Sequence, residues 1–442
     1  MIELNDQQEA AITAMVAFID SNESTFTLKG FAGTGKSTTI QFLIEKMGSS
    51  GIVFTAPTHK AIKVLKRMAG SKGLSVPCCT IHSLLGLRIK QVGDKQILEP
   101  QKHGKNKQLK DVKIIVVDEC SMVGEELFRH ILLSIKEHDI KYIFMGDPAQ
   151  LPPVGENESQ TFEATEHRAT LTKIMRQRGE NPVLGVCTDI REAFARGDSR
   201  LPVLMPGMAD DGSVGVSIMT GALFTEWMPF AFSHDNFDHN PDRFRVIAWR
   251  NDTVDRINEI IHAIRYPDCQ AWLAAGEPIA FTKPLMNAAL VECESGKNGD
   301  EIIIQTDFEG IVISCEPSIN KEIACHKVVA LAEDGKAYAF YAVDNKGKQI
   351  RLAKMQAIAN ENRSMPKEKQ QWWPYYELQQ SFAEIRPAYC LTAHKSQGST
   401  FENVFVDVID VWANPNKNEA LQCLYVACSR ASHHLIVNAS GG

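Results

Sequence analysis

The residues from Gly30 to Ser37 read Gly-Phe-Ala-Gly-Thr-Gly-Lys-Ser and match the phosphate-binding pattern G-x-x-x-x-G-K-[ST] in full. Glycines in this pattern let the backbone curl so that successive N–H groups point at phosphate oxygens, and the helix that follows adds the positive end of its dipole. Lys36 would reach the β- and γ-phosphates, and the Ser37 hydroxyl would hold Mg²⁺. The stretch predicts a nucleoside triphosphate site, whose contacts we assign to Gly33, Thr34, Gly35, Lys36, Ser37 and Thr38.

A second chemical feature is the pair Asp118-Glu119, which directly follows the apolar run Ile114 to Val117. A carboxylate at the carboxyl end of a buried strand lies beside the phosphate loop in parallel α/β sheets. Asp118 would orient Mg²⁺, and Glu119 would polarise the attacking water. The alternative is that the carboxylate only caps the next helix. Together the two motifs predict nucleotide hydrolysis and do not say what it drives.

The elements that must position these residues alternate between strand and helix. An apolar run at Ile52 to Ala56 is bounded by Gly and Pro, as in a buried strand, and Lys36 to Met47 has helical periodicity. Such alternation predicts a parallel sheet covered on both faces. The alternation of strands and helices resumes from Arg245, so we expect two α/β lobes. The same reasoning predicts strands at 26–30, 114–117, 142–145, 246–249, 404–407 and 435–438, and helices at 59–68, 127–135, 252–264 and 420–429.

Two segments interrupt this rhythm and are expected to be insertions. Gly86 to Lys110 is short, polar and basic, as in a small hairpin module. Glu277 to Ile385 holds short alternating strands separated by Gly turns and predicts a β-rich insert. The predicted domains are a first lobe at 1–175 with its insertion at about 86–110, a second lobe at 176–276 and 386–442, and the insert at 277–385.

Composition narrows the class of protein. The chain has 442 residues, of which 44% are apolar and 23% charged, and we expect neither a membrane span nor a signal peptide. Its 11 cysteines show no zinc spacing, which predicts free thiols in a reducing cytoplasm. The net charge of −7 argues against a simple nucleic-acid binder. However, Lys60 to Lys110 carries twelve basic residues against two acidic ones, which is either a solvated surface or a local nucleic-acid groove.

Further motifs occur in a fixed order along the chain. They are Ala56-Pro57-Thr58-His59-Lys60-Ala61, Thr80-Ile81-His82-Ser83-Leu84-Leu85, Gly146-Asp147-Pro148-Ala149-Gln150-Leu151-Pro152-Pro153-Val154, Leu171-Thr172-Lys173-Ile174-Met175-Arg176-Gln177, Leu391-Thr392-Ala393-His394-Lys395-Ser396-Gln397-Gly398, and Leu424-Tyr425-Val426-Ala427-Cys428-Ser429-Arg430-Ala431. With these motifs the sequence resembles the superfamily 1 DNA helicases of the RecD-like branch, from Leu4-Asn5-Asp6-Gln7-Gln8 nearly to the C-terminus. The resemblance implies two RecA-like lobes, with the β-rich insert similar to an SH3-like domain.

The resemblance also implies roles for individual residues. Gln8 would read the adenine of ATP, and Gln150 would sense its γ-phosphate. Arg176 and Arg430 would reach the phosphates from the far side of the cleft and stabilise the charge of the transferring phosphoryl. The alternative for each is a surface salt bridge. DNA contacts are implied for Pro57, Thr58, His59, Thr80, His82, His394 and Gln397. Taken alone, His59 or His394 could equally be a hydrogen-bonded structural histidine.

The expected function is an ATP-dependent DNA helicase that translocates along single-stranded DNA, with 5′-to-3′ polarity implied by the resemblance alone. It would use ATP and Mg²⁺. Its expected partners are single-stranded DNA and single-strand/duplex junctions, with no membrane. It would act in replication, recombination or repair in the cytoplasm, which would be that of an infected host if the protein is phage-encoded. A single-strand-binding protein is the protein partner that this setting suggests. Two alternatives stay open, which are an RNA helicase and a DNA-binding scaffold with an inactive ATPase fold.

Two details of the insertions also stay open at this stage. Family members use the first insertion as a wedge, often with an aromatic tip, but Gly86 to Lys110 contains no Phe, Tyr or Trp. Ile97 and Leu98 are the apolar candidates, and they either wedge the duplex or pack the hairpin onto the first lobe. The aromatic cluster Trp372-Trp373-Pro374-Tyr375-Tyr376 could stack on bases, but we favour core packing.

Overall fold

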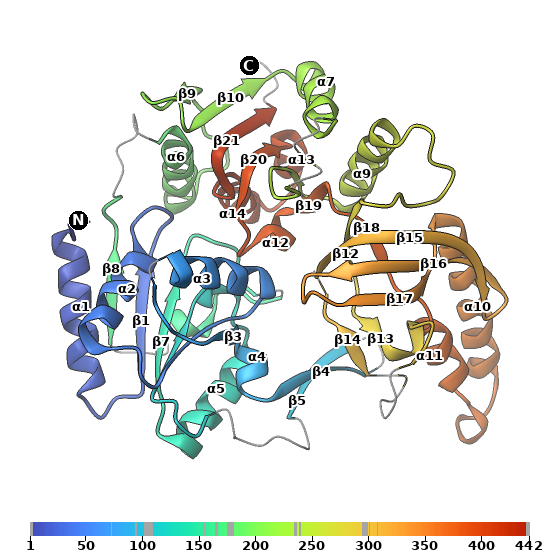
Figure 1. Cartoon of the computed structure of the whole chain (residues 1–442), viewed down its shortest axis with the longest axis horizontal. Coiled ribbons are helices and arrows are strands. Elements are labelled where there is room, and N and C mark those ends of the chain that lie inside the picture. Colours follow the sequence, from blue (N-terminus) through green and yellow to red (C-terminus); the bar gives the residue numbers. More distant parts are fainter. Residues whose placement is uncertain are drawn as a thin grey trace.

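The computed structural model describes residues 3–71, 73–92, 95–100, 109–153, 155–163, 167–174, 181–233, 237, 240–293, 299, 301–306 and 308–438. The described residues form two parallel-sheet lobes and a third, β-rich body (Figure 1). Arg176, with its alternative salt-bridge role, and Lys102, Lys105 and Lys107 of the basic segment lie outside the described residues.

The first lobe is built on a six-stranded sheet with the order β3-β2-β6-β7-β1-β8, in which all neighbouring strands are parallel. One apolar core lies between this sheet and helices α1, α2 and α3, and a second lies on the α5 side. The strands are β1 Thr25–Gly30, β2 Ile52–Ala56, β3 Cys78–Thr80, β6 Ile114–Val117, β7 Lys141–Gly146 and β8 Arg168–Leu171. The helices are α1 Asp6–Ile19, α2 Lys36–Met47, α3 His59–Ser71, α4 Ile81–Leu84 and α5 Glu125–His138, with 3₁₀ turns at Cys120–Met122 and Gln160–Phe162.

The second lobe repeats this architecture with the strand order β19-β11-β20-β21-β10-β9, in which only β9 runs antiparallel to its neighbour. Its strands are β9 Gly207–Met208, β10 Gly215–Met219, β11 Phe244–Ala248, β19 Cys390–Thr392, β20 Phe401–Val406 and β21 Ala431–Asn438. Its helices are α6 Pro182–Arg196, α7 Gly221–Phe232, α9 Asn251–Arg265, α12 Ala393–Ser396, α13 Val408–Trp412 and α14 Lys417–Cys428. The core of this lobe extends to Ala149 and Leu151 of the first lobe, so the two lobes share an apolar interface.

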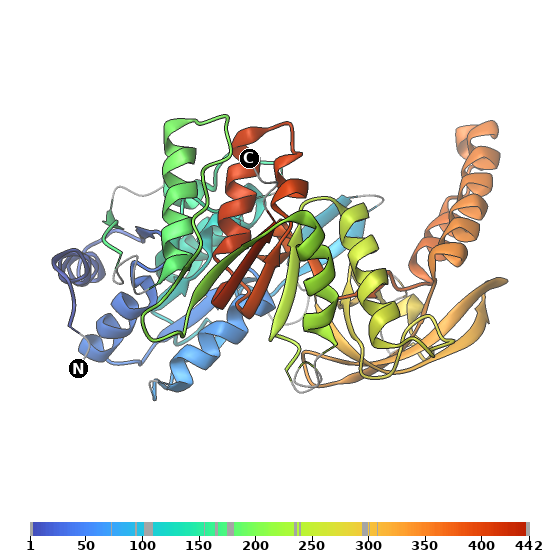
Figure 2. The same cartoon turned by 90° about the horizontal axis from the view of Figure 1, so that it is seen from above.

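The β-rich body is a five-stranded antiparallel sheet with the order β17-β16-β15-β12-β18. Its strands are β12 Pro278–Phe281, β15 Glu309–Asn320, β16 Ile323–Ala332, β17 Ala337–Ala342 and β18 Ile385–Pro387, beside the pair β13 Leu285–Met286 and β14 Ile302–Ile304 and 3₁₀ turns at Asn287–Ala289 and Lys367–Lys369. It also carries the helices α10 Asn345–Ser364 and α11 Trp373–Gln380, which the sequence pattern did not reveal. Helix α10 stands out from the body on the side away from both lobes (Figures 1 and 2). The predicted fold class is thus confirmed, while the domain limits remain a prediction.

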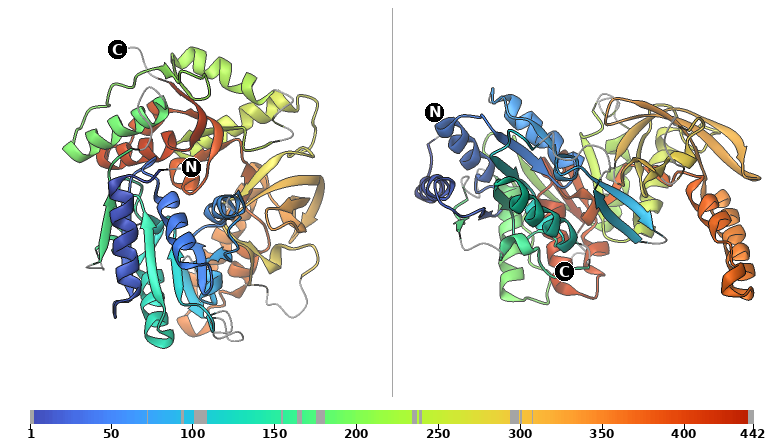
Figure 3. Two further views of the ribbon diagram at one scale, coloured as in Figure 1. Left: turned by 60° about the vertical axis from the view of Figure 1, so that its left-hand side comes forward. Right: turned by 90° about the horizontal axis from the view of Figure 1, so that it is seen from below.

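The first insertion is an antiparallel hairpin of β4 Leu87–Val92 and β5 Lys95–Pro100. It extends from the first lobe toward the β-rich body (Figures 1 and 3). Side chains alternate between the two faces of a strand, and here Leu98 packs against the core of the first lobe whereas Ile97 is 38% exposed. Of the two alternatives, packing onto the first lobe thus applies to Leu98. A wedge role remains a prediction for the exposed side chain of Ile97.

The aromatic cluster at the start of α11 is only partly in a core, contrary to our expectation. Tyr375 packs against an apolar group that includes Met355 and Leu378. Trp373, however, is 64% exposed, and Tyr376 is also exposed. The error arises because a short helix that lies on the surface of a small body can bury only one of its faces.

Two other expectations can be compared with the described residues. All 11 cysteines are free thiols, as the absence of paired spacing predicted. Within the described part of the chain, no helix is both long enough and apolar enough to cross a membrane.

Candidate active site between the two lobes

The phosphate-binding loop joins β1 to α2 at the carboxyl edge of the first sheet. Gly33 and Gly35 adopt φ values of 78° and 80°, in the left-handed region that only glycine enters at little cost. Gly35 is the N-cap of α2 and supplies no side-chain cap, so the N–H groups of the first turn, which includes Ser37 and Thr38, are free of side-chain capping. In this structure Lys36 Nζ donates to Gly30 O at 2.7 Å. The loop can therefore present backbone donors and an ammonium group to phosphate.

Asp118 and Glu119 follow β6, which is separated from β1 by β7 alone. Burial, together with the neighbouring Glu119, raises the pKa of Asp118 to about 7. Glu119 has a φ of 52°, a left-handed conformation that is costly for a residue with a side chain. Such strain persists only where the surrounding structure imposes it, and it clusters at functional sites. Sequence reasoning placed these two carboxylates beside the loop, but it had no means of detecting the strain.

Gln8 lies against the same loop from the N-terminal side. Its Nε2 atom donates to Thr34 O at 3.3 Å, and its Oε1 atom accepts from Asn5 N in a capping box. The side chain is buried. The structure therefore brings Gln8 to the loop but engages both ends of its amide within the chain, so its role at adenine stays a prediction.

Residues of the second lobe lie directly on the phosphate-binding loop. Arg191 of α6 stacks over the Phe31 ring at 4.1 Å from its centroid. A Cβ added at Gly33 would lie only 2.8 Å from Leu184 Cδ1. From α14, the Tyr425 hydroxyl accepts from Ala32 N at 3.0 Å and donates to Asp147 Oδ2. These contacts join positions far apart in the sequence, and no pattern in the sequence indicated them.

Arg430 follows α14 and is buried beneath the same interface. Its Nε atom donates to Val426 O at 2.9 Å, and its Nη1 atom donates to Ser399 O at 3.2 Å. Its Nη2 atom donates to Ser429 Oγ at 2.8 Å. All three hydrogen bonds remain within the second lobe. An arginine that reaches the phosphates would have to exchange these partners, so its role at the phosphoryl group stays a prediction.

Gln150 and Gln397 meet where the two lobes touch. Gln150 is buried, and its Oε1 atom has no hydrogen-bond partner in the described part of the chain. Gln397 comes from the second lobe, and its Nε2 atom donates to Leu151 O at 3.0 Å. Its amide therefore contacts the first lobe in this structure, rather than being free for a DNA strand. A buried acceptor without a partner is unusual in proteins, and the Oε1 atom of Gln150 could accept a hydrogen bond from a bound water or ligand.

The remaining candidates for DNA contact in the first lobe gather at the carboxyl ends of β2 and β3. The hydroxyls of Thr58 and Thr80 accept from Ala61 N and Ser83 N, so each starts a helix. Pro57 directly precedes Thr58 and is only partly buried. Across the interface, Gly398 has a φ of 71°, and an added Cβ would lie 3.2 Å from Thr58 Oγ1. The two sets of predicted DNA residues therefore lie side by side on opposite lobes.

The histidines of this set are neutral at pH 7. Burial lowers the pKa of His82 to about 4, helped by His59 and His130. Burial, and then Lys66, lowers the pKa of His59, whose ring also packs edge-on against Phe308 of the β-rich body at 4.6 Å. Neutral imidazoles contribute hydrogen bonds and ring contacts rather than charge.

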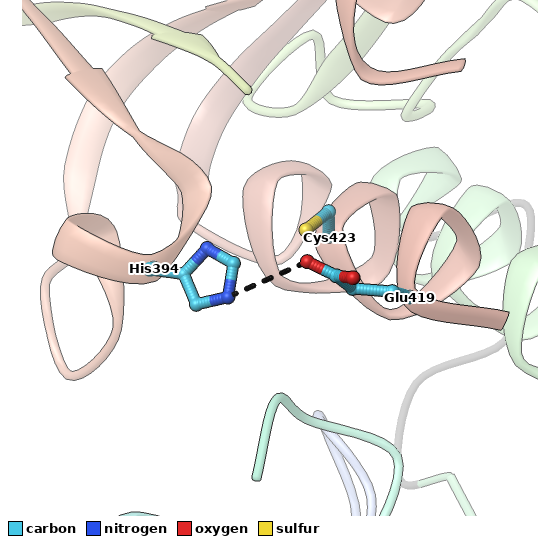
Figure 4. Close-up of side chains that lie close together, drawn as sticks. All are labelled: His394, Glu419 and Cys423. Carbon is cyan, nitrogen blue, oxygen red and sulfur yellow. Dashed lines mark ion pairs between the residues drawn. The ribbon is translucent and has the colours of Figure 1, made fainter. Parts of the chain in front are cut away.

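His394 faces two side chains of α14, as Figure 4 shows. Its Nε2 atom lies 3.9 Å from Glu419 Oε1, and Cys423 follows one turn later on the same helix. These three residue types can bind metals, and burial raises the pKa of the Cys423 thiol to about 12. The ion pair of this group joins His394 to Glu419. We interpret the group as a contact that orients His394, whose own pKa burial lowers.

The basic segment is partly neutralised within the chain. Lys60 Nζ lies 2.6 Å from Glu309 Oε1 of the β-rich body, and Lys63 Nζ lies 3.4 Å from Asp242 Oδ2 of the second lobe. These two charges, for which the sequence left open a solvated surface or a nucleic-acid groove, thus take part in contacts between the parts of the molecule.

Comparison with known proteins extends this description. Residues 3–200 match the AAA domain family, and residues 387–438 match the UvrD-like helicase C-terminal domain. Two relatives match nearly end to end. Uncharacterized protein R530 of Acanthamoeba polyphaga mimivirus is 26% identical, over 98% of this chain and 99% of its own. ATP-dependent DNA helicase dda of Enterobacteria phage T4 is 25% identical, over 91% of this chain and 92% of its own.

The fold is also found among solved structures. The Pif1 helicase from Bacteroides in complex with ADP-AlF3 and ssDNA superposes with a TM-score of 0.50 and 20% identity, over 100% of this chain and 94% of that one. Two matched domains, full-length relatives and this fold agree. The chain is thus similar to superfamily 1 helicases, as its motifs predicted.

Proposed function

We propose that this protein is an ATP-dependent DNA helicase that moves along single-stranded DNA and separates duplexes. The observation that carries the proposal is the direct contact between the phosphate-binding loop of one lobe and α14 of the other. A nucleotide at that loop must alter how the lobes meet, and the predicted DNA residues lie at the same interface. The phage T4 relative is named an ATP-dependent DNA helicase, and the Bacteroides Pif1 structure contains ADP-AlF3 and ssDNA, both of which support this proposal.

Hydrolysis would use groups from both lobes. Lys36 and the N–H groups of the loop hold the phosphates, and Glu119 accepts a proton from the attacking water. Gln150 senses the γ-phosphate by donating a hydrogen bond from its Nε2 atom to a phosphate oxygen. Arg430, with Arg176 as its expected companion, completes the site from the second lobe and stabilises the charge that spreads over the phosphoryl group. Because these arginines belong to the other lobe, hydrolysis is tied to closure of the cleft.

Mg²⁺ fits the residues of this site. Asp118 and Glu119 are adjacent carboxylates, and burial, followed by the charge of Glu119, raises the pKa of Asp118, so a nearby cation would favour its charged form. Asp118 and the Ser37 hydroxyl are oxygen donors of the kind that Mg²⁺ prefers, and they would hold it. When bound, the ion would neutralise charge on the phosphate oxygens.

DNA would be held at the carboxyl ends of β2, β3 and β19. The histidines there are neutral, so the side chains would supply hydrogen bonds and ring contacts, and backbone N–H groups would hold phosphates without reading bases. Alternate opening and closing of the lobes would then shift the strand past these contacts. We propose 5′-to-3′ movement, with DNA preferred over RNA.

The test has three parts. ATP hydrolysis is measured with and without single-stranded DNA, and Lys36→Ala should lower the stimulated rate by at least about 10²-fold; an unchanged rate would refute the assigned site. Unwinding is compared on 5′-tailed and 3′-tailed duplexes, and equal or greater activity on 3′ tails would refute the polarity. Matched DNA and RNA strands are then compared as activators, and stronger activation by RNA would make the protein an RNA helicase. Nucleotide binding without turnover on any strand would identify an inactive scaffold.

A further inference from the structure

Among the described contacts of α14, only the Tyr425 side chain bonds both to the phosphate-binding loop and to the segment after β7. Its hydroxyl accepts from Ala32 N at 3.0 Å and donates to Asp147 Oδ2 at 2.5 Å. Tyr425 is 2% exposed and Asp147 is fully buried, so water does not compete for these bonds. Asp147 is fixed in turn, because its Oδ1 atom accepts from Ala149 N at 2.9 Å.

The same helix carries a second link to this segment. Gln422, one turn before Tyr425, donates from Nε2 to Gln150 O at 3.2 Å. Arg430 follows the helix end, and its Nε atom donates back to Val426 O. The helix therefore behaves as a rigid connection between the loop, the Gln150 segment and Arg430, and the tyrosine hydroxyl fixes its distance from the loop.

We propose that Tyr425 is a positioning residue for ATP hydrolysis, whose hydroxyl sets α14, and with it Arg430, at the correct distance from the phosphate-binding loop when the lobes close. The inference rests on the proposed function and goes beyond it, because it assigns the coupling between lobe closure and chemistry to a single hydroxyl group. Burial, and then Asp147, raises the pKa of Tyr425 well above its ordinary value, so the hydroxyl keeps its proton and remains a donor throughout the neutral range.

The test is the substitution Tyr425→Phe, which keeps the buried ring and removes only the hydroxyl. We expect kcat for DNA-stimulated ATP hydrolysis to fall about tenfold, the scale of one lost hydrogen bond to a charged group, while KM for ATP changes by less than about twofold. The matched control is Tyr142→Phe, because Tyr142 is also fully buried and, in the described part of the chain, its hydroxyl bonds only to Ser134 Oγ, inside the first lobe. The control should leave kcat unchanged.

Asp147→Asn provides an independent route, because it removes the charge from the other side of the same bond without altering α14. It should give the same loss in kcat, and the double variant should be no slower than the slower single one. An unchanged kcat in Tyr425→Phe, a rise in KM alone, or losses that multiply in the double variant would overturn the inference. An inactive wild-type protein would instead overturn the proposed function, so the two failures are distinguishable.

Discussion

Glu309, the first residue of β15, binds the three parts of the molecule together through one carboxylate. Its Oε1 atom lies 2.6 Å from Lys60 Nζ of the first lobe, and its Oε2 atom lies 3.1 Å from Arg245 Nη2 of the second. Arg245 is 1% exposed, and the side chains of Lys60 and Glu309 are also largely buried. We predict that Glu309→Gln will weaken this junction strongly, because it removes the nearer carboxylate from the buried guanidinium of Arg245 and leaves Asp242, whose Oδ1 atom lies 3.9 Å from Arg245 Nη2.

The size of the effect follows from the pKa of Glu309. Burial alone would raise that pKa, but Arg245 and Lys60 outweigh it and hold the pKa at about 2, against an ordinary value of 4.5. A difference of this size corresponds to about 3 kcal/mol in favour of the ionised form in the folded protein. Removing one partner of a buried ion pair costs about 3–5 kcal/mol in other proteins. We therefore expect Glu309→Gln to lower the free energy of unfolding by about 3 kcal/mol at pH 7.

The assay is chemical denaturation of the wild type and the variant at a series of pH values. The matched control is Glu377→Gln, because Glu377 lies 2.6 Å from Lys321 in an ion pair whose two side chains are 41% and 43% exposed. That exposed pair should be worth less than about 1 kcal/mol. If Glu309→Gln costs no more than the control, the carboxylate does not hold the junction and the reasoning is wrong.

The pH dependence gives a second check on the same residue. A carboxyl whose pKa is lowered by folding contributes stability above its unfolded pKa, and the contribution disappears as the pH falls through the folded value. Between about pH 5 and pH 7 the difference also contains Glu333, whose pKa burial and then Glu309 raise to about 7. Below that range, the difference between the wild type and Glu309→Gln should shrink as the pH falls from about 4.5 toward about 2. A difference that grows below pH 4.5 would contradict the assignment.

The hydrogen bond that His262 donates to the Glu277 carboxylate raises the pKa of His262. This contact between the second lobe and the β-rich body therefore stabilises most below pH 6.5 and weakens as the pH rises through the raised pKa. His262→Gln should thus cost about 1–3 kcal/mol at pH 6 and less at pH 9, by denaturant titration; a cost that increases with pH would count against it. In the hairpin, Leu98→Ser should lower stability by about 1–2 kcal/mol, whereas Ile97→Ser should change it by less than about 0.5 kcal/mol and reduce unwinding but not ATP hydrolysis. Equal effects of the two on unwinding and stability would reject a wedge role for Ile97. Neutralising Lys102, Lys105 and Lys107 together should lower the slope of log K against log salt for single-stranded DNA by about 2, and an unchanged slope would place these residues away from the strand.

The sequence predicted the elements with strong local signals to within a residue or two. Strands Ile52–Ala56 and Ile114–Val117 are continuous apolar runs, and the helix Lys36–Met47 begins and ends at glycines, so local chemistry alone defines their limits. Helix Asn345–Ser364 was missed because its anchor is not an apolar stripe. Arg351, which is buried, instead bonds to Glu384 beyond the helix. A charge that is neutralised by a residue more than thirty positions away leaves no periodic signal.

The candidate site divides in the same way. The loop from Gly30 to Ser37 and the carboxylates Asp118 and Glu119 could be found because their chemistry needs fixed residue types at fixed spacing. The contact of Tyr425 with Ala32 could not, since it joins residues almost four hundred positions apart and depends on how two lobes pack. Motif patterns thus identify the groups that would do the chemistry, whereas the groups that set distances between lobes emerge only from the fold.

The same interface carries both predicted binding sites, and this has an energetic consequence. On one side, Tyr425 and Arg191 of the second lobe hold the phosphate-binding loop, and on the other, Gly398 lies against Thr58 at the predicted DNA site. If ATP and DNA each favour one arrangement of the lobes, the factor by which ATP changes DNA affinity must equal the factor by which DNA changes ATP affinity. A coupling of about 1–3 kcal/mol, the usual size between two such sites, would change each affinity by about 5- to 150-fold. A translocase needs two lobe arrangements of similar free energy. If ATP binding could not change the arrangement of the lobes, the protein would bind ATP and DNA but would not move along the strand.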